Sequence, residues 1–298
     1  MTIRPALLGI DLGTSQVKVL LCAPDGTVLG QGKAGYQVST PRQGWAEADP
    51  EHWWQATCAA VRSAVGPARA EVSAIAAVGQ MHGLVLVSER ASVLRPGILW
   101  LDRRSTAELD DYQRLPADLR ARLGNPPSVG MAGPVLLWLS RHEPDAYRRA
   151  RWMLQPKDWL RLRLTGRAAT DPTDASGTLL FDLERDAWAV DAAEALGLRT
   201  DLLPVIRPSA EIAGTLRPAA AGQLGLRPGL PVATGAADTA SSLLAAQLPA
   251  GRWGLLTLGT GGQLLVPSAP RRIIHFRRGV GCWPTPWRCR STRPALSG

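Results

Sequence analysis

The sequence predicts an α/β protein, in which short buried strands alternate with helices. Short apolar runs recur along the chain, and turns rich in Gly and Pro separate them from segments with a helical spacing of apolar residues. The 298 residues suffice for one large domain or two ordinary ones. No apolar run reaches the ~18 residues of a membrane-spanning helix, and the N-terminus lacks the pattern of a signal peptide. We therefore expect a cytoplasmic protein that does not engage a membrane.

The N-terminal segment predicts three strands and a turn suited to a polyphosphate. An apolar run ends in Asp11, the small residues Gly13 and Thr14 follow, and a second run spans residues 17–21. A hairpin turn at residues 25–26 precedes the third strand. Amide groups of the first turn can face phosphate oxygens, and the Asp11 carboxylate can hold hydrated Mg²⁺. The alternative is a buried hairpin closed by a tight glycine turn.

Start and stop signals predict the next elements. Asp49 precedes Pro50 and Glu51, a pattern typical of a capped helix start, and that helix ends near residues 66–67. Further helices are predicted at 135–139, 158–164 and 238–246, and buried strands at 75–78, 84–87, 98–100, 231–235 and 255–258.

Polar side chains that can do chemistry lie at the ends of predicted strands. His82 lies in Gly-Gln-Met-His-Gly and can exchange a hydrogen bond with a hydroxyl, although a lone His is more often structural. Asp102 and Arg104 either bracket a polyol with paired donors and acceptors or form a surface ion pair. Residues 170–171 and 174–177 are consistent with a polar cavity wall or with a plain turn.

Asp238 is the sharpest candidate for a catalytic group. It lies at a strand-to-helix junction in Thr-Gly-Ala-Ala-Asp-Thr-Ala-Ser, where no bulky side chain blocks a substrate hydroxyl. The alternative is an ordinary helix cap. Gly259, Thr260 and Gly261 form a second small-residue turn after a strand. Two such turns can grip a nucleotide phosphate chain from opposite sides.

The net charge of +9 comes mostly from the C-terminal end. Residues 271–298 contain seven Arg and no acidic residue, so the rest of the chain is near neutrality. A near-neutral domain has no broad phosphate-binding face, and we expect no nucleic-acid partner. The segment 271–298 has no regular apolar period, and we expect a disordered, aberrant tail of the kind that a shifted reading frame produces. A basic arm for an anionic partner is the alternative.

Six motifs occur in the order seen in the FGGY carbohydrate kinases, and the chain resembles that family over about residues 6–268. They are Ile-Asp-Leu-Gly-Thr-Ser at 10–15, Gly-Trp-Ala-Glu-Ala-Asp-Pro-Glu-His-Trp-Trp at 44–54, Gly-Gln-Met-His-Gly at 79–83, Ile-Leu-Trp-Leu-Asp-Arg-Arg at 98–104, Gln-Pro-Lys-Asp-Trp-Leu-Arg at 155–161 and Thr-Leu-Gly-Thr at 257–260. The third motif resembles the xylulokinase branch, since glycerol kinases carry an Arg-Glu pair there. The resemblance implies the actin-like ATPase fold, with ribonuclease-H-like domains, a mixed sheet flanked by helices and a closing cleft.

The resemblance implies a role for each matching residue. Asp238 matches the base that takes the proton from the sugar hydroxyl as it attacks ATP, and Asp11 matches a second catalytic acid that holds Mg²⁺ through water. The implied substrate-binding residues are Met81, His82, Asp102 and Arg104. The implied nucleotide-binding residues are Gly13, Thr14, Gly259, Thr260 and Gly261.

The resemblance also implies a reaction, which is phosphorylation of a ketopentose, D-xylulose to D-xylulose 5-phosphate being the expected case. ATP and Mg²⁺ are the implied cofactors, and a small sugar is the implied partner. A homodimer is implied for full-length members. The alternatives are a kinase of the same family for another polyol or ketose and a non-catalytic sugar-binding fragment.

The family pattern divides the chain into three parts. Residues 1–247 match the N-terminal sugar-binding and catalytic domain, 248–270 match the first hairpin of a C-terminal nucleotide domain, and 271–298 are the tail. Since recognisable sequence ends near residue 268, we expect this chain to be truncated and its phosphoryl transfer impaired. Ala236 and Ala237 replace glycines beside the base, and Leu101 replaces a common Asn in the substrate loop.

Overall fold

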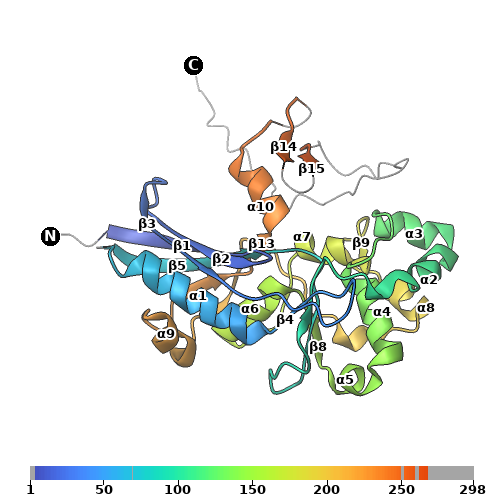
Figure 1. Cartoon of the computed structure of the whole chain (residues 1–298). Coiled ribbons are helices and arrows are strands. Elements are labelled where there is room, and N and C mark those ends of the chain that lie inside the picture. Colours follow the sequence, from blue (N-terminus) through green and yellow to red (C-terminus); the bar gives the residue numbers. More distant parts are fainter. Residues whose placement is uncertain (1–3, 69, 250–251, 259–261, 268–298) are drawn as a thin grey trace.

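The computed structural model describes residues 4–68, 70–249, 252–258 and 262–267, and the chain folds as the predicted α/β protein (Figure 1). A mixed sheet of seven strands lies at one end and a group of short helices at the other. Six strands pair in the order β11-β12-β5-β1-β2-β3, and β13 pairs with the end of β5. The bounds are β1 (Arg4–Leu12), β2 (Gln16–Cys22), β3 (Val28–Gly35), β5 (Ala70–Gly79), β11 (Ile212–Thr215), β12 (Pro231–Ala233) and β13 (Ala236–Ala237).

The strands β1, β2 and β3 form the predicted antiparallel unit, and β5 joins β1 in parallel after the helix α1 (Pro50–Val65). Side chains alternate along β1, so Leu8 and Ile10 are buried in the core that α1 shares. Leu7 is 48% exposed on the opposite face, and Asp11 lies on that same face. Asp11 therefore stands on the side of the sheet that α1 does not cover.

The helix α1 begins where the sequence predicted and packs closely on the sheet. The Asp49 carboxylate accepts a hydrogen bond of 2.9 Å from the Glu51 amide, and Pro50 occupies the first helical turn. A Cβ on Gly32 of β3 would lie 2.0 Å from the Ala60 carbonyl oxygen of α1. The layer is completed by α6 (Pro156–Thr165) and α9 (Pro218–Leu224), which both contact α1.

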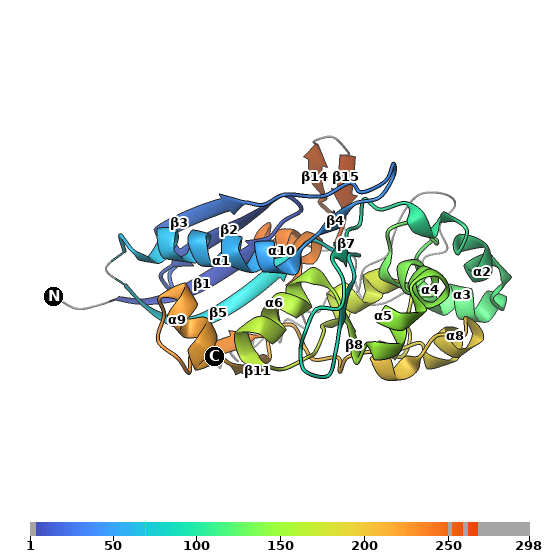
Figure 2. The same ribbon diagram turned by 60° about the horizontal axis from the view of Figure 1, so that its bottom comes forward.

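The short helices gather at one end of the molecule (Figure 2), and a second hydrophobic core lies among them. Tyr112, Leu136 and Leu180 are fully buried in it. Its elements, with the short strands beside them, are β4 (Glu47–Ala48), β6 (Val85–Val87), β7 (Gly97–Ile98), η1 (Arg104–Thr106), α2 (Leu109–Arg114), α3 (Ala117–Leu123), α4 (Ala132–His142), α5 (Pro144–Arg149), β8 (Trp152–Leu154), α7 (Pro172–Ala175), η2 (Ser176–Thr178), β9 (Phe181–Asp182), β10 (Ala187–Trp188), α8 (Val190–Ala195) and η3 (Thr200–Leu202).

The predicted strand at 231–235 and helix at 238–246 are observed as β12, β13 and α10 (Asp238–Ala245). Gly235 separates the two strands with φ +85°, and a Cβ there would lie 2.0 Å from the Ala77 carbonyl oxygen. The predicted strand at 98–100 is shorter than expected. It ends at Ile98, because its partner β4 has only two residues.

The predicted strand at 255–258 is β14 (Leu255–Leu258), which pairs with β15 (Gly262–Leu265) in an antiparallel hairpin. The predicted phosphate turn Gly259-Thr260-Gly261 and the predicted tail 271–298 lie outside the described residues. Within the described part of the chain, no helix combines the length and apolarity needed to cross a membrane.

The contact between β3 and α1 gives a stability prediction. Gly32→Ala places a methyl group against the Ala60 carbonyl and is expected to lower the free energy of unfolding by about 1–3 kcal/mol. Gly222→Ala on α9, where a Cβ meets nothing within 4 Å, is expected to raise it by about 0.5–1 kcal/mol. Urea unfolding of both variants measures the difference. Equal stability of the two variants would contradict the close packing.

Candidate active site

The structure brings Asp11 and Asp238 to the same end of neighbouring strands. Asp11 near the end of β1 and Ala236 on β13 both pair with Val78 of β5. Their backbones are therefore two strand spacings apart, roughly 9–10 Å. Asp238 follows β13 directly as the first residue of α10, and this helix lies on the side of the sheet opposite α1 (Figure 1). The two carboxylates thus share the open side of the sheet.

The environment of Asp238 favours a basic carboxylate. Burial raises its pKa, hydrogen bonds from Thr239 lower it, and the charge of Asp11 raises it again, with a net rise above the ordinary value. The Thr239 amide donates to Asp238 Oδ1 at 2.6 Å, which fixes one carboxylate oxygen. Asp11 has Lys18 Nζ at 3.6 Å, in a partly exposed ion pair.

Two side chains, Tyr36 and Gln80, stabilise the turn after β1, and neither was predicted from the sequence to contact it. The Tyr36 hydroxyl donates to the Gly13 carbonyl, and Gln80 Nε2 donates to the Tyr36 oxygen at 3.3 Å. The Gly13 amide donates to the Gln16 carbonyl at 3.1 Å. The Gly13 amide is therefore engaged within the turn, and the predicted contacts of Gly13 and Thr14 with phosphate stay predictions.

Thr14 faces the loop that follows β7. The Trp100 indole donates to the Thr14 hydroxyl oxygen at 2.9 Å, and the Trp100 side chain stays 44% exposed. Because this oxygen accepts from Trp100, the hydroxyl hydrogen of Thr14 is directed elsewhere and can be donated to an anionic oxygen. Trp100 was seen in the sequence only as part of a strand.

His82 is held in one tautomer by backbone groups. It has the left-handed conformation, φ 68°, and its amide donates to Gln155 Oε1 at 2.9 Å. Its Nδ1 lies 2.8 Å from the Gly177 carbonyl oxygen, which can only accept, so Nδ1 carries the proton. Burial lowers the pKa of His82, which favours the neutral ring, and in this tautomer Nε2 is the acceptor nitrogen. Met81 beside it is buried, with 6% exposure.

Asp102 and Arg104 form an ion pair, which was one of the two alternatives predicted from the sequence. The pair is buried, however, whereas a surface pair was expected. The Asp102 carboxylate accepts from the Ala46 amide at 2.6 Å and from Arg104 Nε at 2.8 Å. Arg104 also donates to Glu47 at 2.6 Å and stacks 3.7 Å from the Trp45 ring centroid. In this arrangement the pair fixes the loop that carries Trp100, and its predicted contact with sugar stays a prediction.

A buried cluster of charges lies beneath the strand ends. The sequence predicted its members to be part of a helix at 158–164 and either a polar cavity wall or plain turns at 170–171 and 174–177. Lys157 Nζ lies 2.6 Å from Asp158, 3.0 Å from Asp171 and 3.2 Å from Asp174. Arg161 donates to Asp158 at 2.9 Å and to the Thr234 carbonyl at 2.8 Å. All of these side chains are almost wholly buried. Residues 170–171 and 174–177 are therefore not a plain turn.

In this cluster, burial and the neighbouring charges act on the pKa values of the side chains in opposite directions. Burial opposes the charge of Lys157, but the three carboxylates raise its pKa above the ordinary value. Burial likewise opposes ionisation of Asp158, yet Lys157 and Arg161 hold its pKa low. Burial raises the pKa of Asp174 well above its ordinary value. Lys157 and Arg161 are therefore the two cations of a buried cluster that also holds Asp158, Asp171 and Asp174.

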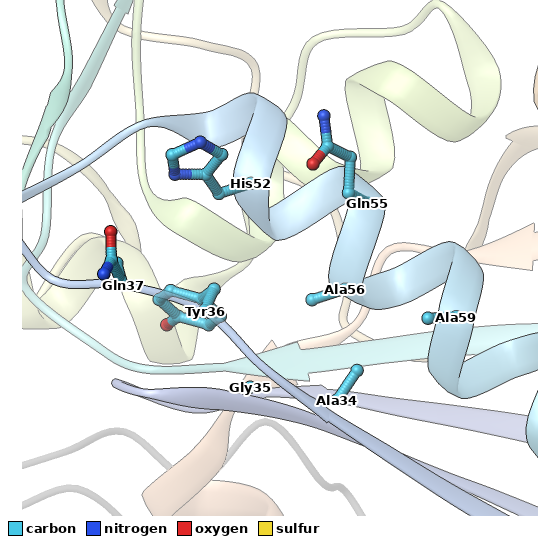
Figure 3. A pocket seen from close by; sticks show the side chains of 8 residues that line it. All are labelled: Ala34, Gly35, Tyr36, Gln37, His52, Gln55, Ala56 and Ala59. Carbon is cyan, nitrogen blue, oxygen red and sulfur yellow. The ribbon is translucent and has the colours of Figure 1, made fainter.

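A separate cavity of about 340 Å³ lies between the end of β3 and α1 (Figure 3). Tyr36, Gln37, His52 and Gln55 line it together with small residues. None of the residues predicted for sugar, phosphate or metal lines this cavity. Tyr36 connects it to the candidate site through the Gly13 carbonyl.

The donor set at the strand ends fits hydrated Mg²⁺ carried by phosphate. Mg²⁺ commonly takes one or two carboxylates from the protein and keeps several waters. Asp11 provides one partly exposed carboxylate, and Asp238 lies near enough for the charge of Asp11 to raise its pKa. Among the described residues, no group of three or more His, Cys, Asp or Glu side chains forms a metal cage.

Comparison with known proteins identifies the family. The profile described as the FGGY family of carbohydrate kinases, N-terminal domain, matches residues 6–245. The chain belongs to the FGGY family of carbohydrate kinases. It is 38% identical over 275 residues to the xylulose kinase of Escherichia coli (strain K12) and 36% identical over 274 residues to that of Klebsiella pneumoniae. Each alignment covers 90% of this chain and 56% of the relative.

The structural comparison agrees with the family assignment. The crystal structure of xylulose kinase from Rhodospirillum rubrum matches with a TM-score of 0.84 at 28% identity, over 89% of this chain and 56% of that one. The fold is the actin-like ATPase fold of this family, as the resemblance implied. The chain spans about half the length of the relatives that it matches.

The buried cluster predicts a large cost for removing its central cation. Lys157→Met leaves buried carboxylates without their shared partner and is expected to lower the free energy of unfolding by about 3–5 kcal/mol. Lys33→Met, on an exposed position of β3, is the control and is expected to change it by less than about 0.5 kcal/mol. Chemical denaturation measures both variants. Similar stabilities would show that the cluster is dispensable.

The position of His82 predicts its protonation state. Since burial lowers its pKa below about 6.5, the unfolded chain binds the proton more readily. The contribution of His82 to stability is therefore complete above about pH 6.5 and is lost as the pH falls below it. Long-range ¹⁵N NMR of the imidazole is expected to show Nδ1 protonated and Nε2 unprotonated at pH 6.5. An imidazolium, or the opposite tautomer, would contradict this assignment.

Proposed function

We propose that this chain supplies the sugar-binding and catalytic half of a kinase that transfers the γ-phosphoryl group of ATP to a ketopentose. D-xylulose is the substrate that the relatives favour, because they are named xylulose kinases at 30–38% identity. The observation that carries the proposal is the placement of Asp238, a half-buried carboxylate of raised pKa beside Asp11 on the open side of the sheet.

Asp238 acts in this proposal as the general base. Its carboxylate takes the proton from one sugar hydroxyl while that oxygen bonds to the γ-phosphorus and the bond from phosphorus to the β,γ-bridging oxygen breaks. The hydrogen bond from the Thr239 amide holds one oxygen of the carboxylate in place. A raised pKa makes the carboxylate a stronger base, and the pKa of a catalytic base works best near the operating pH.

Other residues bind and orient the reactants. His82 accepts a hydrogen bond from a sugar hydroxyl at Nε2, because its Nδ1 proton is committed to the Gly177 carbonyl. Thr14 donates its hydroxyl hydrogen to a phosphate oxygen, because Trp100 occupies the acceptor side of that hydroxyl. Asp11 is the carboxylate that would hold hydrated Mg²⁺, which supplies charge stabilisation when bound. Asp102 and Arg104 fix the loop beside the sugar.

The domain division is part of the same proposal. Residues 1–247 form the sugar-binding and catalytic domain, and residues 248–270, with the β14–β15 hairpin, begin a nucleotide domain whose Gly259-Thr260-Gly261 turn contacts phosphate. Impairment of phosphoryl transfer stays a prediction. The homodimer implied for full-length members also stays a prediction.

Removing the proposed base is the direct test. Asp238→Asn keeps the shape of the side chain but cannot take a proton, so the turnover number with D-xylulose, ATP and Mg²⁺ is expected to fall about 10²–10⁴-fold. The dissociation constant for D-xylulose, measured by calorimetry, is expected to stay within about threefold. Parental turnover in this variant would remove Asp238 from the mechanism, and an absence of D-xylulose binding by the parent chain would contradict the sugar assignment.

Asp11 is expected to respond differently. Asp11→Asn weakens a carboxylate on the metal rather than the base, so the Mg²⁺ concentration for half-maximal turnover is expected to rise about tenfold or more. Glu89→Gln, an exposed carboxylate in a distant turn, is the control for loss of one negative charge. An equal change in the control would show a general effect of charge.

A further inference from the structure

The backbone segment that delivers Asp238 is fastened by a side chain outside the predicted site. The amide of Ala237, the residue immediately before Asp238, donates to the hydroxyl oxygen of Thr173 at 2.9 Å. Two residues earlier, the Gly235 amide donates to the Ser209 carbonyl at 3.0 Å. Thr173 is fully buried on α7, far from β13 in sequence.

The direction of the hydrogen bond at Thr173 is fixed by Asp171. The Asp171 Oδ2 atom accepts from the Thr173 hydroxyl at 2.5 Å, from the Thr173 amide at 3.1 Å and from the Ser209 hydroxyl at 2.6 Å. Because this oxygen accepts from all three donors, the hydroxyl proton of Thr173 points to Asp171. The lone pairs of the same oxygen are thereby presented to the Ala237 amide.

Asp171 is itself anchored in the buried cluster of charges. Its Oδ1 atom lies 3.0 Å from Lys157 Nζ, and both side chains are fully buried. A carboxylate with a buried lysine at one oxygen and three donors at the other has little freedom to move. The path from Lys157 through Asp171 and Thr173 to the Ala237 amide is therefore continuous and rigid.

The same short segment also holds the proposed sugar contact. The Gly177 carbonyl takes the Nδ1 proton of His82. The Asp174 carbonyl accepts from Gln155 Nε2 at 2.5 Å, and Gln155 Oε1 in turn accepts from the His82 amide. Residues 171–178 thus connect the segment before Asp238 to His82, on two different strand ends.

We propose that Thr173 is a positioning residue for Asp238, which it places by holding the Ala237 amide against the buried Asp171–Lys157 pair. The role rests on the proposed kinase function. The positioning role is distinct from the capping of α7. The capping hydrogen bond is donated to Asp171 by the Thr173 amide, and every substitution of Thr173 except Pro retains that amide. Only the hydroxyl reaches Ala237.

The test compares Thr173→Val, Thr173→Ser and Thr57→Val in the full 298-residue chain. Val removes the hydroxyl with little change of volume, and Ser keeps it. Thr57 is a control because it is also fully buried, while its hydroxyl bonds only to the Trp53 carbonyl within α1. The readouts are hydrogen exchange of the Ala237 amide and the pKa of the Asp238 carboxyl from ¹³C NMR, neither of which needs turnover.

In Thr173→Val, the Ala237 amide is expected to exchange at least tenfold faster. The Asp238 pKa is expected to move toward its ordinary value, since a loosened carboxylate gains solvent. Lys18 on β2 and Asp11 on β1, the charged groups that act on Asp238, are unchanged in all variants. Thr173→Ser and Thr57→Val are expected to match the parent in both readouts, and the turnover number of Thr173→Val to fall at least tenfold with KM for D-xylulose within threefold.

Two results would overturn the positioning role. One is parental amide exchange and Asp238 pKa in Thr173→Val. The other is a Thr173→Ser variant whose Ala237 amide exchange or Asp238 pKa differs from the parent. This second result would overturn the positioning role even if Thr173→Val does not fold. A parent chain that binds no D-xylulose would contradict the proposed function instead, and the two failures are therefore distinguishable.

Discussion

The structure around the candidate site depends on one buried ammonium group. Lys157 lies under the ends of the central strands, where its Nζ contacts three carboxylates. Desolvating a lysine is costly unless carboxylates repay it, and here they raise its pKa in spite of burial. The candidate site of this chain therefore lies over a charged interior rather than over apolar packing alone. A Cβ on Gly79 or Gly235 would lie 3.2 Å from the Lys157 side chain, so glycines at these two strand ends leave room for it.

This constraint explains why distant segments converge. The cluster holds α7 in place. Hydrogen bonds from α7 and the turn after it hold the segment before Asp238 and the turn that carries His82. That turn contacts the end of β1, because the Gln80 amide donates to the Leu12 carbonyl at 2.9 Å. Apolar packing of α1 covers the opposite face of the sheet. Asp11 and Asp238 lie on the face that α1 does not cover, and we propose that the reactants bind there. Preorganised chemistry requires catalytic groups that a rigid layer supports, on a face that reactants can reach.

Much of the fold was predictable because local signals were strong. The Asp49-Pro50 cap, the small residues after Asp11 and the strand-to-helix junction at Asp238 are short-range patterns, and each appeared where the sequence placed it. Contacts that depend on long-range packing were not predictable. Nothing local indicates that Tyr36 reaches Gly13, that Thr173 reaches Ala237 or that Asp102 and Arg104 are buried together. The strand at 98–100 was overestimated because its partner strand is short.

The central claim is that the sugar meets His82 and Asp238 together, on the open side of the sheet. Titration of D-xylulose into the ¹³C,¹⁵N-labelled chain, followed at the Asp238 carboxyl carbon and the His82 Nε2 resonance, tests it most directly. Both resonances are predicted to shift saturably with one dissociation constant, while the residues lining the cavity between β3 and α1 stay unchanged. Shifts confined to that cavity, with Asp238 and His82 unaffected, would contradict the account.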